Sequence, residues 1–197
     1  MSRHWIVFDY GEVLCSRTTA VPEMAAALGV GVAEFEPAYW GLRDAYDRGS
    51  ADIEYWRSIG AVVGAEVDEA MSATLTELDI EGWSCLEPAA LELVAALSEA
   101  GASLALLSNA PSSFGRWVEQ QEFSKLFEVL LFSGDVRLAK PDAEIYRELL
   151  SRLDAAPGDC LFLDDRQSNV DGANAVGVRA HRWLGAAEAR SWLEPEK

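Results

Sequence analysis

The stretch HWIVFDYGEVL, residues 4–14, decides how this chain is built. Its apolar residues 5–8 form a short run that ends at Asp9, and Gly11 follows two residues later. Short apolar runs bounded by turn residues are typical of strands buried in a parallel sheet. Ligands of open parallel sheets bind beyond the carboxyl ends of the strands. Asp9 is therefore a candidate for chemistry, although a strand can also end in Asp only to cap the following turn.

The rest of the sequence divides into a helical part and an alternating part. Helical patterns cover residues 22–28, 32–46, 52–60 and 67–78. From Pro88 onward, strand patterns at 103–107, 127–132, 160–163 and 178–183 alternate with helical patterns at 88–100, 112–121, 140–153 and 168–176. Such alternation predicts an α/β fold, with a mainly parallel sheet covered by helices on both faces. The helical part is an insert after the first strand.

Composition and charge restrict the partners. The chain has 197 residues and a formal charge of −17, from 33 acids against 16 Lys and Arg. This charge repels nucleic acid and anionic membranes, so we expect neither as a partner. Three cysteines without metal-type spacing indicate a reducing compartment. Because there is no signal sequence and no apolar run near the ~20 residues that span a bilayer, we expect a cytoplasmic protein. Nothing in the sequence indicates an oligomeric state.

Polar residues stand where several of these strands end. They are Asp9, Ser108 with Asn109, Asp164 with Asp165, and Lys140 after a fourth strand. The carboxyl ends of parallel strands share one edge of the sheet, so these side chains can converge on one crevice. Two adjacent acids at a buried strand end are costly without a cation.

These groups are the ones that phosphoryl transfer needs. Asp9 can attack phosphorus and form an aspartyl-phosphate, which divides one difficult displacement into two easier ones. Mg²⁺ takes hard oxygen ligands, which Asp9 and Asp165 supply, and neutralises the developing charge. Lys140 and Ser108 can stabilise the transferring phosphoryl oxygens.

Four segments resemble, in order, the four motifs of the haloacid dehalogenase (HAD) superfamily. They are FDYGEVL, LLSNA, LAKPDAEIY and FLDDRQSNVDGANAVG, and the match extends over essentially the whole chain. The resemblance implies a Rossmann-like core from residues 1–15 and 86–197, with residues 16–85 as an inserted all-helical, mobile cap. We expect aromatic residues of the cap such as Trp40 and Trp56 to pack in its interior. Arg17 and Arg43 could reach a substrate from the cap, but we expect each to form a surface salt bridge instead.

The resemblance also assigns roles to single residues. Asp9 is expected to be the nucleophile, with Ser108 and Lys140 completing the catalytic set. The residues expected to contact phosphate or substrate are Gly11, Glu12, Ser108, Asn109 and Lys140. Those expected to hold Mg²⁺ are Asp9, the Gly11 carbonyl, Asp165, and Asp164 as a ligand or as a support for the ligands.

One position departs from the usual phosphatase motif. Phosphatases of the superfamily carry DxD, whose second Asp transfers protons, and here that position is Gly11. Proton transfer of this kind contributes ~10²–10⁴ in rate. Three interpretations stay open: the substrate has a good leaving group, Glu12 takes over the role, or turnover is lost. The first resembles a DxG branch that includes bacterial glucose-1-phosphate phosphatases, which act on an anomeric sugar phosphate.

The resemblance therefore predicts a Mg²⁺-dependent phosphatase that acts on a small phosphorylated metabolite. One alternative is a non-catalytic protein that binds phosphate. The other is a metal-free 2-haloacid dehalogenase. Dehalogenases of the superfamily typically lack one of the paired acids, so Asp164 and Asp165 argue against the second alternative.

Overall fold

A five-stranded parallel sheet forms the centre of the protein, in the computed structural model that describes residues 3–193. The strand order is β3-β2-β1-β4-β5, and every pair of neighbours is parallel. The strands are β1 (Trp5–Phe8), β2 (Ser103–Ser108), β3 (Val129–Phe132), β4 (Cys160–Asp164) and β5 (Arg179–Arg182). The predicted α/β fold is confirmed, and the strand that opens the chain lies in the middle of the sheet.

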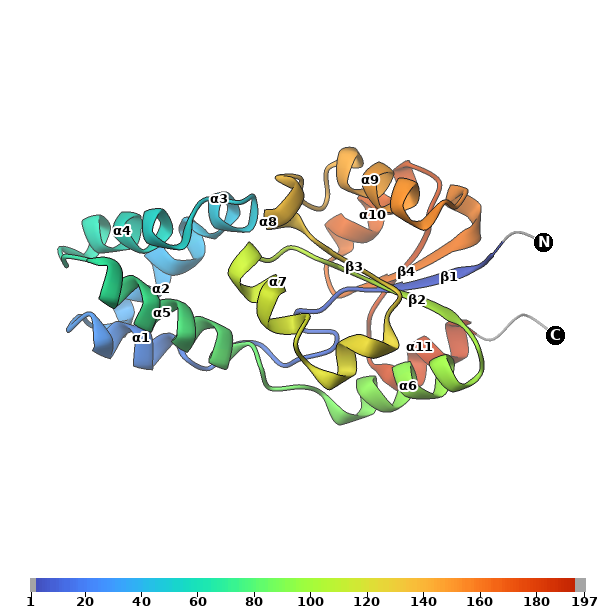
Figure 1. Cartoon of the computed structure of the whole chain (residues 1–197), viewed down its shortest axis with the longest axis horizontal. Helices are drawn as coiled ribbons and strands as arrows, with labels where there is room; N and C mark the ends of the chain where they lie inside the picture. The colour runs from blue at the N-terminus through green and yellow to red at the C-terminus, as the bar shows by residue number, and fades with distance from the viewer. Residues whose placement is uncertain (1–2, 194–197) are drawn as a thin grey trace.

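Helices cover both faces of this sheet because successive strand residues point to opposite sides. Phe8 packs in one hydrophobic cluster with Val94 of α6, and Val7 packs in another with Leu149 of α9. Figure 1 shows α6 and α11 on one face and α9 and α10 on the other. The helices outside the insert are α6 (Pro88–Glu99), α7 (Ser112–Val118), α8 (Ser133–Val136), α9 (Ala143–Leu153), α10 (Gln167–Ala175) and α11 (Ala186–Leu193).

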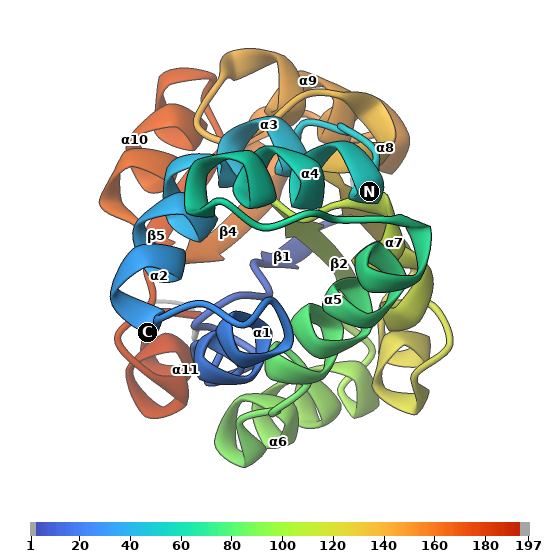
Figure 2. The same ribbon diagram turned by 90° about the vertical axis from the view of Figure 1, so that its left-hand side faces the viewer.

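Five helices between β1 and α6 form a separate layer. They are α1 (Val21–Ala27), α2 (Val32–Gly41), α3 (Arg43–Asp47), α4 (Asp52–Val63) and α5 (Glu69–Gly82). They bury a hydrophobic cluster of their own, in which Trp56 is fully buried as expected. Figure 2 shows this layer in front of the carboxyl ends of the strands. The layer is tied to the rest of the protein by an ion pair of Arg48 with Asp142 (2.8 Å) and by Ser113, which donates to Asp52 (2.9 Å).

The structure corrects several predicted boundaries. The single helix expected over residues 32–46 is two helices, α2 and α3, separated at Leu42. The helix expected to stop at Gly60 continues to Val63 and ends at Gly64, whose φ of +74° suits glycine. Gly60 instead serves packing, because a Cβ there would lie 2.6 Å from the Ala65 carbonyl oxygen.

Other elements carried too little local pattern to be predicted. Lys140 does not open a helix, since α9 begins at Ala143. The short helix α8, the C-terminal helix α11 and two 3₁₀ turns, Glu122–Leu126 and Pro157–Asp159, were not anticipated.

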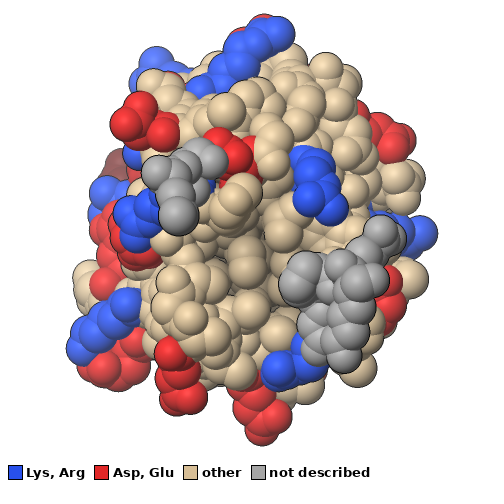
Figure 3. Space-filling view, turned by 90° about the vertical axis from the view of Figure 1, so that its right-hand side faces the viewer, with Lys and Arg blue, Asp and Glu red and all other residues tan. Residues whose placement is uncertain are grey.

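Charge is distributed without a continuous basic surface on the side that faces away from α1–α5. Figure 3 shows that Lys and Arg side chains on this face lie singly among acidic and uncharged residues. Among residues 3–193, no helix is both long enough and apolar enough to cross a bilayer.

Candidate active site

Asp9 is held rigidly just beyond the end of the central strand. Its N–H donates to the Leu163 carbonyl (2.9 Å), which extends the pairing of β1 with β4 by one residue. Its carboxylate Oδ1 accepts from the N–H of Tyr10 (2.7 Å). The Tyr10 hydroxyl donates in turn to the Trp83 carbonyl (2.8 Å), so the loop after β1 is fastened to the end of α5. Asp9 is 6% exposed and lines a pocket, which gives a buried carboxylate one accessible side.

The ammonium of Lys140 joins the ends of three strands. Its Nζ lies 2.7 Å from Asp9 Oδ1 and 2.7 Å from Asp164 Oδ2, and it donates to the Leu107 carbonyl (2.9 Å). Burial alone would lower the pKa of Lys140, but the carboxylates of Asp164 and Asp9 raise it. The lysine therefore stays charged and holds two acids in place.

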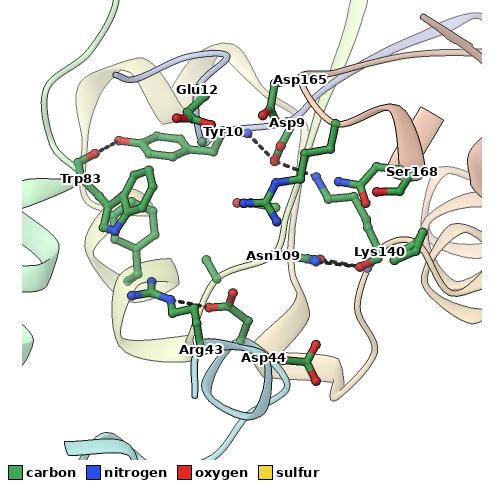
Figure 4. Close-up of a pocket in the computed structure, with 18 of the residues that line it drawn as sticks. Asp9, Tyr10, Glu12, Arg43, Asp44, Trp83, Asn109, Lys140, Asp165 and Ser168 are labelled. Atoms are coloured by element: carbon green, nitrogen blue, oxygen red, sulfur yellow. Dashed lines mark hydrogen bonds and ion pairs between the residues drawn. The ribbon is translucent and has the colours of Figure 1, made fainter. Parts of the chain in front are cut away.

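Asn109 fixes the backbone that carries this lysine. Its amide nitrogen donates to the Lys140 carbonyl (2.9 Å), and its Oδ1 accepts from the Lys140 N–H (2.9 Å), as Figure 4 shows. Both ends of the amide are thus committed to one residue. We predicted Asn109 as a substrate contact; in the structure it lines the pocket and positions Lys140. Ser108, which ends β2, is buried and lines the same pocket.

Three carboxylates converge beside the lysine. One oxygen each of Asp9, Asp164 and Asp165 lie within 4.8 Å of one another. Asp164 is fully buried, and its two oxygens accept from Lys140, from the Asn169 amide (2.9 and 3.0 Å) and from the N–H of Arg166 (2.9 Å). Its capacity is largely used by protein donors, whereas Asp165 is only half-buried.

The donor set fits a divalent cation that prefers oxygen. Burial raises the pKa of Asp9 to about 8, because desolvation outweighs the attraction of Lys140. Burial and the neighbouring Asp164 also raise the pKa of Asp165, to about 6. Such crowding is unfavourable for charged acids and is relieved by a cation. Hard carboxylate oxygens are the ligands that Mg²⁺ takes.

Asp9, Lys140 and Asp165 line a pocket of about 360 Å³ that is shared by the sheet edge and the helical insert. Figure 4 shows Asp9, Asp165 and Lys140 across the pocket from Arg43 and Asp44, which come from α3. The predicted site residues that line it are Asp9, Gly11, Glu12, Ser108, Asn109, Lys140 and Asp165. Asp164 does not line it and lies behind Lys140.

The glycine that interrupts the usual motif lies beside the ring of Trp83 and lines the pocket. A Cβ on Gly11 would lie 3.6 Å from the Trp83 ring, an ordinary contact, so packing alone does not require glycine there. Glu12, the neighbouring acid, has φ of +56°, an uncommon left-handed conformation for a glutamate. Its carboxylate is one of the groups that raise the pKa of Asp165.

The insert contributes pocket residues that we expected elsewhere: Trp40, predicted in the interior of the cap, lines the pocket. Arg43, expected in a surface salt bridge, is mostly buried: its guanidinium donates to Asp47 (2.9 Å), Asp79 (2.8 Å) and the Tyr39 hydroxyl (2.7 Å). The spacing of Arg43 and Asp47 in one helix was a readable signal. Asp79 lies on a different helix and could not be found that way. Arg17, the other expected surface salt bridge, lies 4.7 Å above the ring of Trp40.

Comparison with known proteins gives one family match. The sequence model of the haloacid dehalogenase-like hydrolases matches residues 4–177. A sesquiterpene phosphatase of Aspergillus oryzae is 24% identical over 176 residues, which cover 87% of this chain and 85% of that protein. A phosphoglycolate phosphatase of Salmonella choleraesuis is 32% identical over 93 residues, 47% of this chain. That match spans only 37% of the Salmonella enzyme.

The fold has counterparts among solved structures. A variant of a HAD family enzyme from Bacteroides thetaiotaomicron, in complex with magnesium and inorganic phosphate, superposes with a TM-score of 0.79. The two sequences are 18% identical, and the match covers 98% of this chain and 100% of the other. At this identity the likeness concerns the fold.

Proposed function

Because this chain belongs to the haloacid dehalogenase-like hydrolases, we propose that it hydrolyses phosphomonoesters through an aspartyl-phosphate on Asp9. The observation that carries the proposal is the ammonium of Lys140, which lies 2.7 Å from both Asp9 and Asp164 beside the half-buried Asp165. A nucleophile, a buried cation and a group of oxygen ligands thus meet at one wall of a pocket.

Each residue has a defined part in the proposed reaction. An oxygen of Asp9 attacks phosphorus, the bond from phosphorus to the leaving oxygen breaks, and water later hydrolyses the acyl phosphate. Lys140 and Ser108 offset the negative charge on the phosphoryl oxygens, and Asn109 holds the backbone of Lys140 in place. Asp9, Asp165 and the Gly11 carbonyl would hold Mg²⁺, with Asp164 supporting them. Bound Mg²⁺ would neutralise charge on the transferring group.

Gly11 bears on the choice of substrate. With no acid at this position and with the Trp83 ring beside it, the leaving oxygen receives no proton from the usual residue. A leaving group that is stable without protonation, such as the anomeric oxygen of a sugar phosphate, would need the least help. This requirement supports a relation to the DxG branch with its glucose-1-phosphate phosphatases.

The helical insert would act as a cap on this site. We assign residues 16–85 to the cap and residues 1–15 and 86–197 to the core, because α1–α5 have a hydrophobic cluster separate from those of the sheet. The cap supplies one wall of a pocket of about 360 Å³, a volume that suits a small metabolite. A cap in this place would exclude bulk water from the reaction.

Phosphate release from a panel of sugar and aryl phosphates tests the proposal. We expect release that requires Mg²⁺, is lost with EDTA and is lost in Asp9→Asn. An Asp154→Asn variant is the matched control, because Asp154 is exposed at the end of α9, outside the pocket. Halide release from a 2-haloacid in the presence of EDTA would overturn the proposal in favour of a dehalogenase. Silence across the panel, with Mg²⁺-dependent binding of beryllofluoride, would favour the non-catalytic alternative.

A further inference from the structure

The cap wall of the pocket contains an arginine whose charge is already neutralised. The guanidinium of Arg43 lies 2.9 Å from Asp47 and 2.8 Å from Asp79, and its side chain is 12% exposed. Burial alone would lower the pKa of Arg43, but Asp79 and the other neighbouring anions raise it, so it remains a cation. One cation against two carboxylates leaves this cluster, Arg43–Asp47–Asp79, with a net charge of −1.

The neighbouring charges do not reverse that sign. Asp44 lies on the same wall, is mostly exposed and is paired with Arg48 at 3.1 Å. Arg166, on the loop after β4, lines the pocket and has no carboxylate within 4.0 Å among the described residues. Arg166 lies on the sheet side of the pocket, where the lining includes three acids, Asp9, Glu12 and Asp165, and two cations, Lys140 and Arg166. Of the described residues that line the pocket from the cap, Arg43 is thus the one cation, and Asp44, Asp47 and the adjacent Asp79 outnumber it.

The same wall also contains two uncharged aromatic side chains that a ligand could contact. The rings of Trp40 and Trp83 meet edge to face with centroids 6.2 Å apart, and both line the pocket. The indole N–H of Trp40 is buried and has no hydrogen-bond partner within residues 3–193. A buried donor without a partner is uncommon in a folded protein. The aromatic rings provide a surface on which an uncharged leaving group can pack.

We propose that this pocket selects phosphomonoesters whose leaving group carries no negative charge, with Trp40 and Trp83 contacting that group and Asp47 excluding a second anion. The inference rests on the proposed phosphatase function and concerns the choice of substrate. Asp47 is a specificity-determining residue because it faces the pocket while cancelling the charge of Arg43. A substrate carboxylate placed against this wall would meet like charge at short range.

Two aryl phosphates of equal size test the charge alone. They are 4-carbamoylphenyl phosphate, which is neutral at the ring substituent, and 4-carboxyphenyl phosphate, which is anionic there. We expect kcat/KM to favour the carbamoyl compound by about 10-fold or more. In Asp47→Asn the Arg43–Asp47–Asp79 cluster becomes neutral, and we expect this preference to shrink about 5-fold or more, mainly through a lower KM for the carboxyl compound. The Asp154→Asn control should keep the wild-type preference.

A second variant covers the case in which Asp47→Asn does not fold. Asp44→Asn removes a mostly exposed charge from the same wall, and we expect a shift in the same direction but smaller. A wild-type enzyme that hydrolyses both compounds equally, or prefers the carboxyl compound, would overturn the inference and leave the phosphatase function standing. So would a folded Asp47→Asn variant with an unchanged preference. If neither compound, nor glucose 1-phosphate, releases phosphate with Mg²⁺, the proposed function itself fails.

Discussion

Replacing Lys140 by methionine should expose how much of the fold depends on the charges of the site. Methionine keeps most of the buried stem but removes the ammonium that lies 2.7 Å from Asp9 and from Asp164. Breaking a buried ion pair by removing one partner costs about 3–5 kcal/mol, because the other charge is left buried without compensation. Whole domains are stable by about 5–15 kcal/mol. We therefore expect Lys140→Met to lose a large share of its free energy of unfolding.

The loss should depend on pH in a defined direction. Burial already raises the pKa of Asp9 to about 8, and Lys140 is the main group that lowers it. An acid whose pKa is raised in the folded state stabilises the fold below its unfolded pKa, and this contribution is lost as the pH rises through the folded pKa. Without Lys140 the pKa of Asp9 rises further. The variant should therefore be destabilised more at pH 8.5 than at pH 5.5.

Urea unfolding at both pH values measures this loss. The matched control is Lys125→Met, because Lys125 forms a 2.7 Å ion pair with Glu122 at the surface, where such pairs contribute about 0–1 kcal/mol. We also expect Lys140→Met to lower kcat by about 10²-fold or more, since it removes a charge that stabilises the phosphoryl oxygens. The reasoning would be refuted if the two variants lost equal stability. It would also be refuted if the loss in Lys140→Met were the same at both pH values.

Three further predictions follow from the geometry of the site. Mg²⁺ should raise the Tm more at pH 8 than at pH 5.5. The pKa of Asp9 is raised to about 8 and that of Asp165 to about 6, so at the lower pH bound protons compete with the cation. Equal shifts of Tm at the two pH values in a thermal melt would contradict this. Asn109→Ala should lower kcat about 10-fold or more with little change in KM, since it frees the backbone of Lys140. Asn174→Ala is the control: it removes one hydrogen bond, which the Ala180 N–H donates to the Asn174 side chain, and it should leave steady-state kinetics unchanged. Gly11→Asp should fit beside Trp83 and raise kcat for alkyl phosphates by about 10-fold or more, with a smaller gain for anomeric or aryl phosphates; a uniform loss for all substrates would show that the aspartate does not transfer a proton.

The sheet and one side of the site could be predicted because their signals are local. A buried strand that ends in a polar residue is visible in a few letters, and parallel topology then brings Asp9, Lys140 and Asp165 to one edge. The order of strands, with β1 in the middle, was not predicted, because it depends on pairing between segments far apart in the sequence. The pattern could not show that the paired acids differ in role. Asp164 accepts hydrogen bonds from Lys140 and Asn169, and these contacts are visible only in the folded structure.

The cap side of the site was hidden for a different reason. Arg43 and Asp79 are brought together by the packing of separate helices, and no periodicity in the sequence reports that contact. The break between α2 and α3 at Leu42 directly follows Gly41, although the helical spacing of apolar residues continues through it. Asn109 had a readable position at a strand end, but its partner is the backbone of a residue in a distant loop.

The lysine that joins three strand ends also ties the site to the order in which the chain is made. Asp9 leaves the ribosome early, Lys140 much later, and Asp164 later still. During synthesis the nascent chain therefore contains Asp9 before Lys140 and Asp164 are present. Contacts between residues far apart in sequence form late, because closing the intervening loops costs conformational entropy. The ion-pair network is thus complete only when β4 has paired with β1. Catalytic activity would then be a direct measure of how many chains have finished folding.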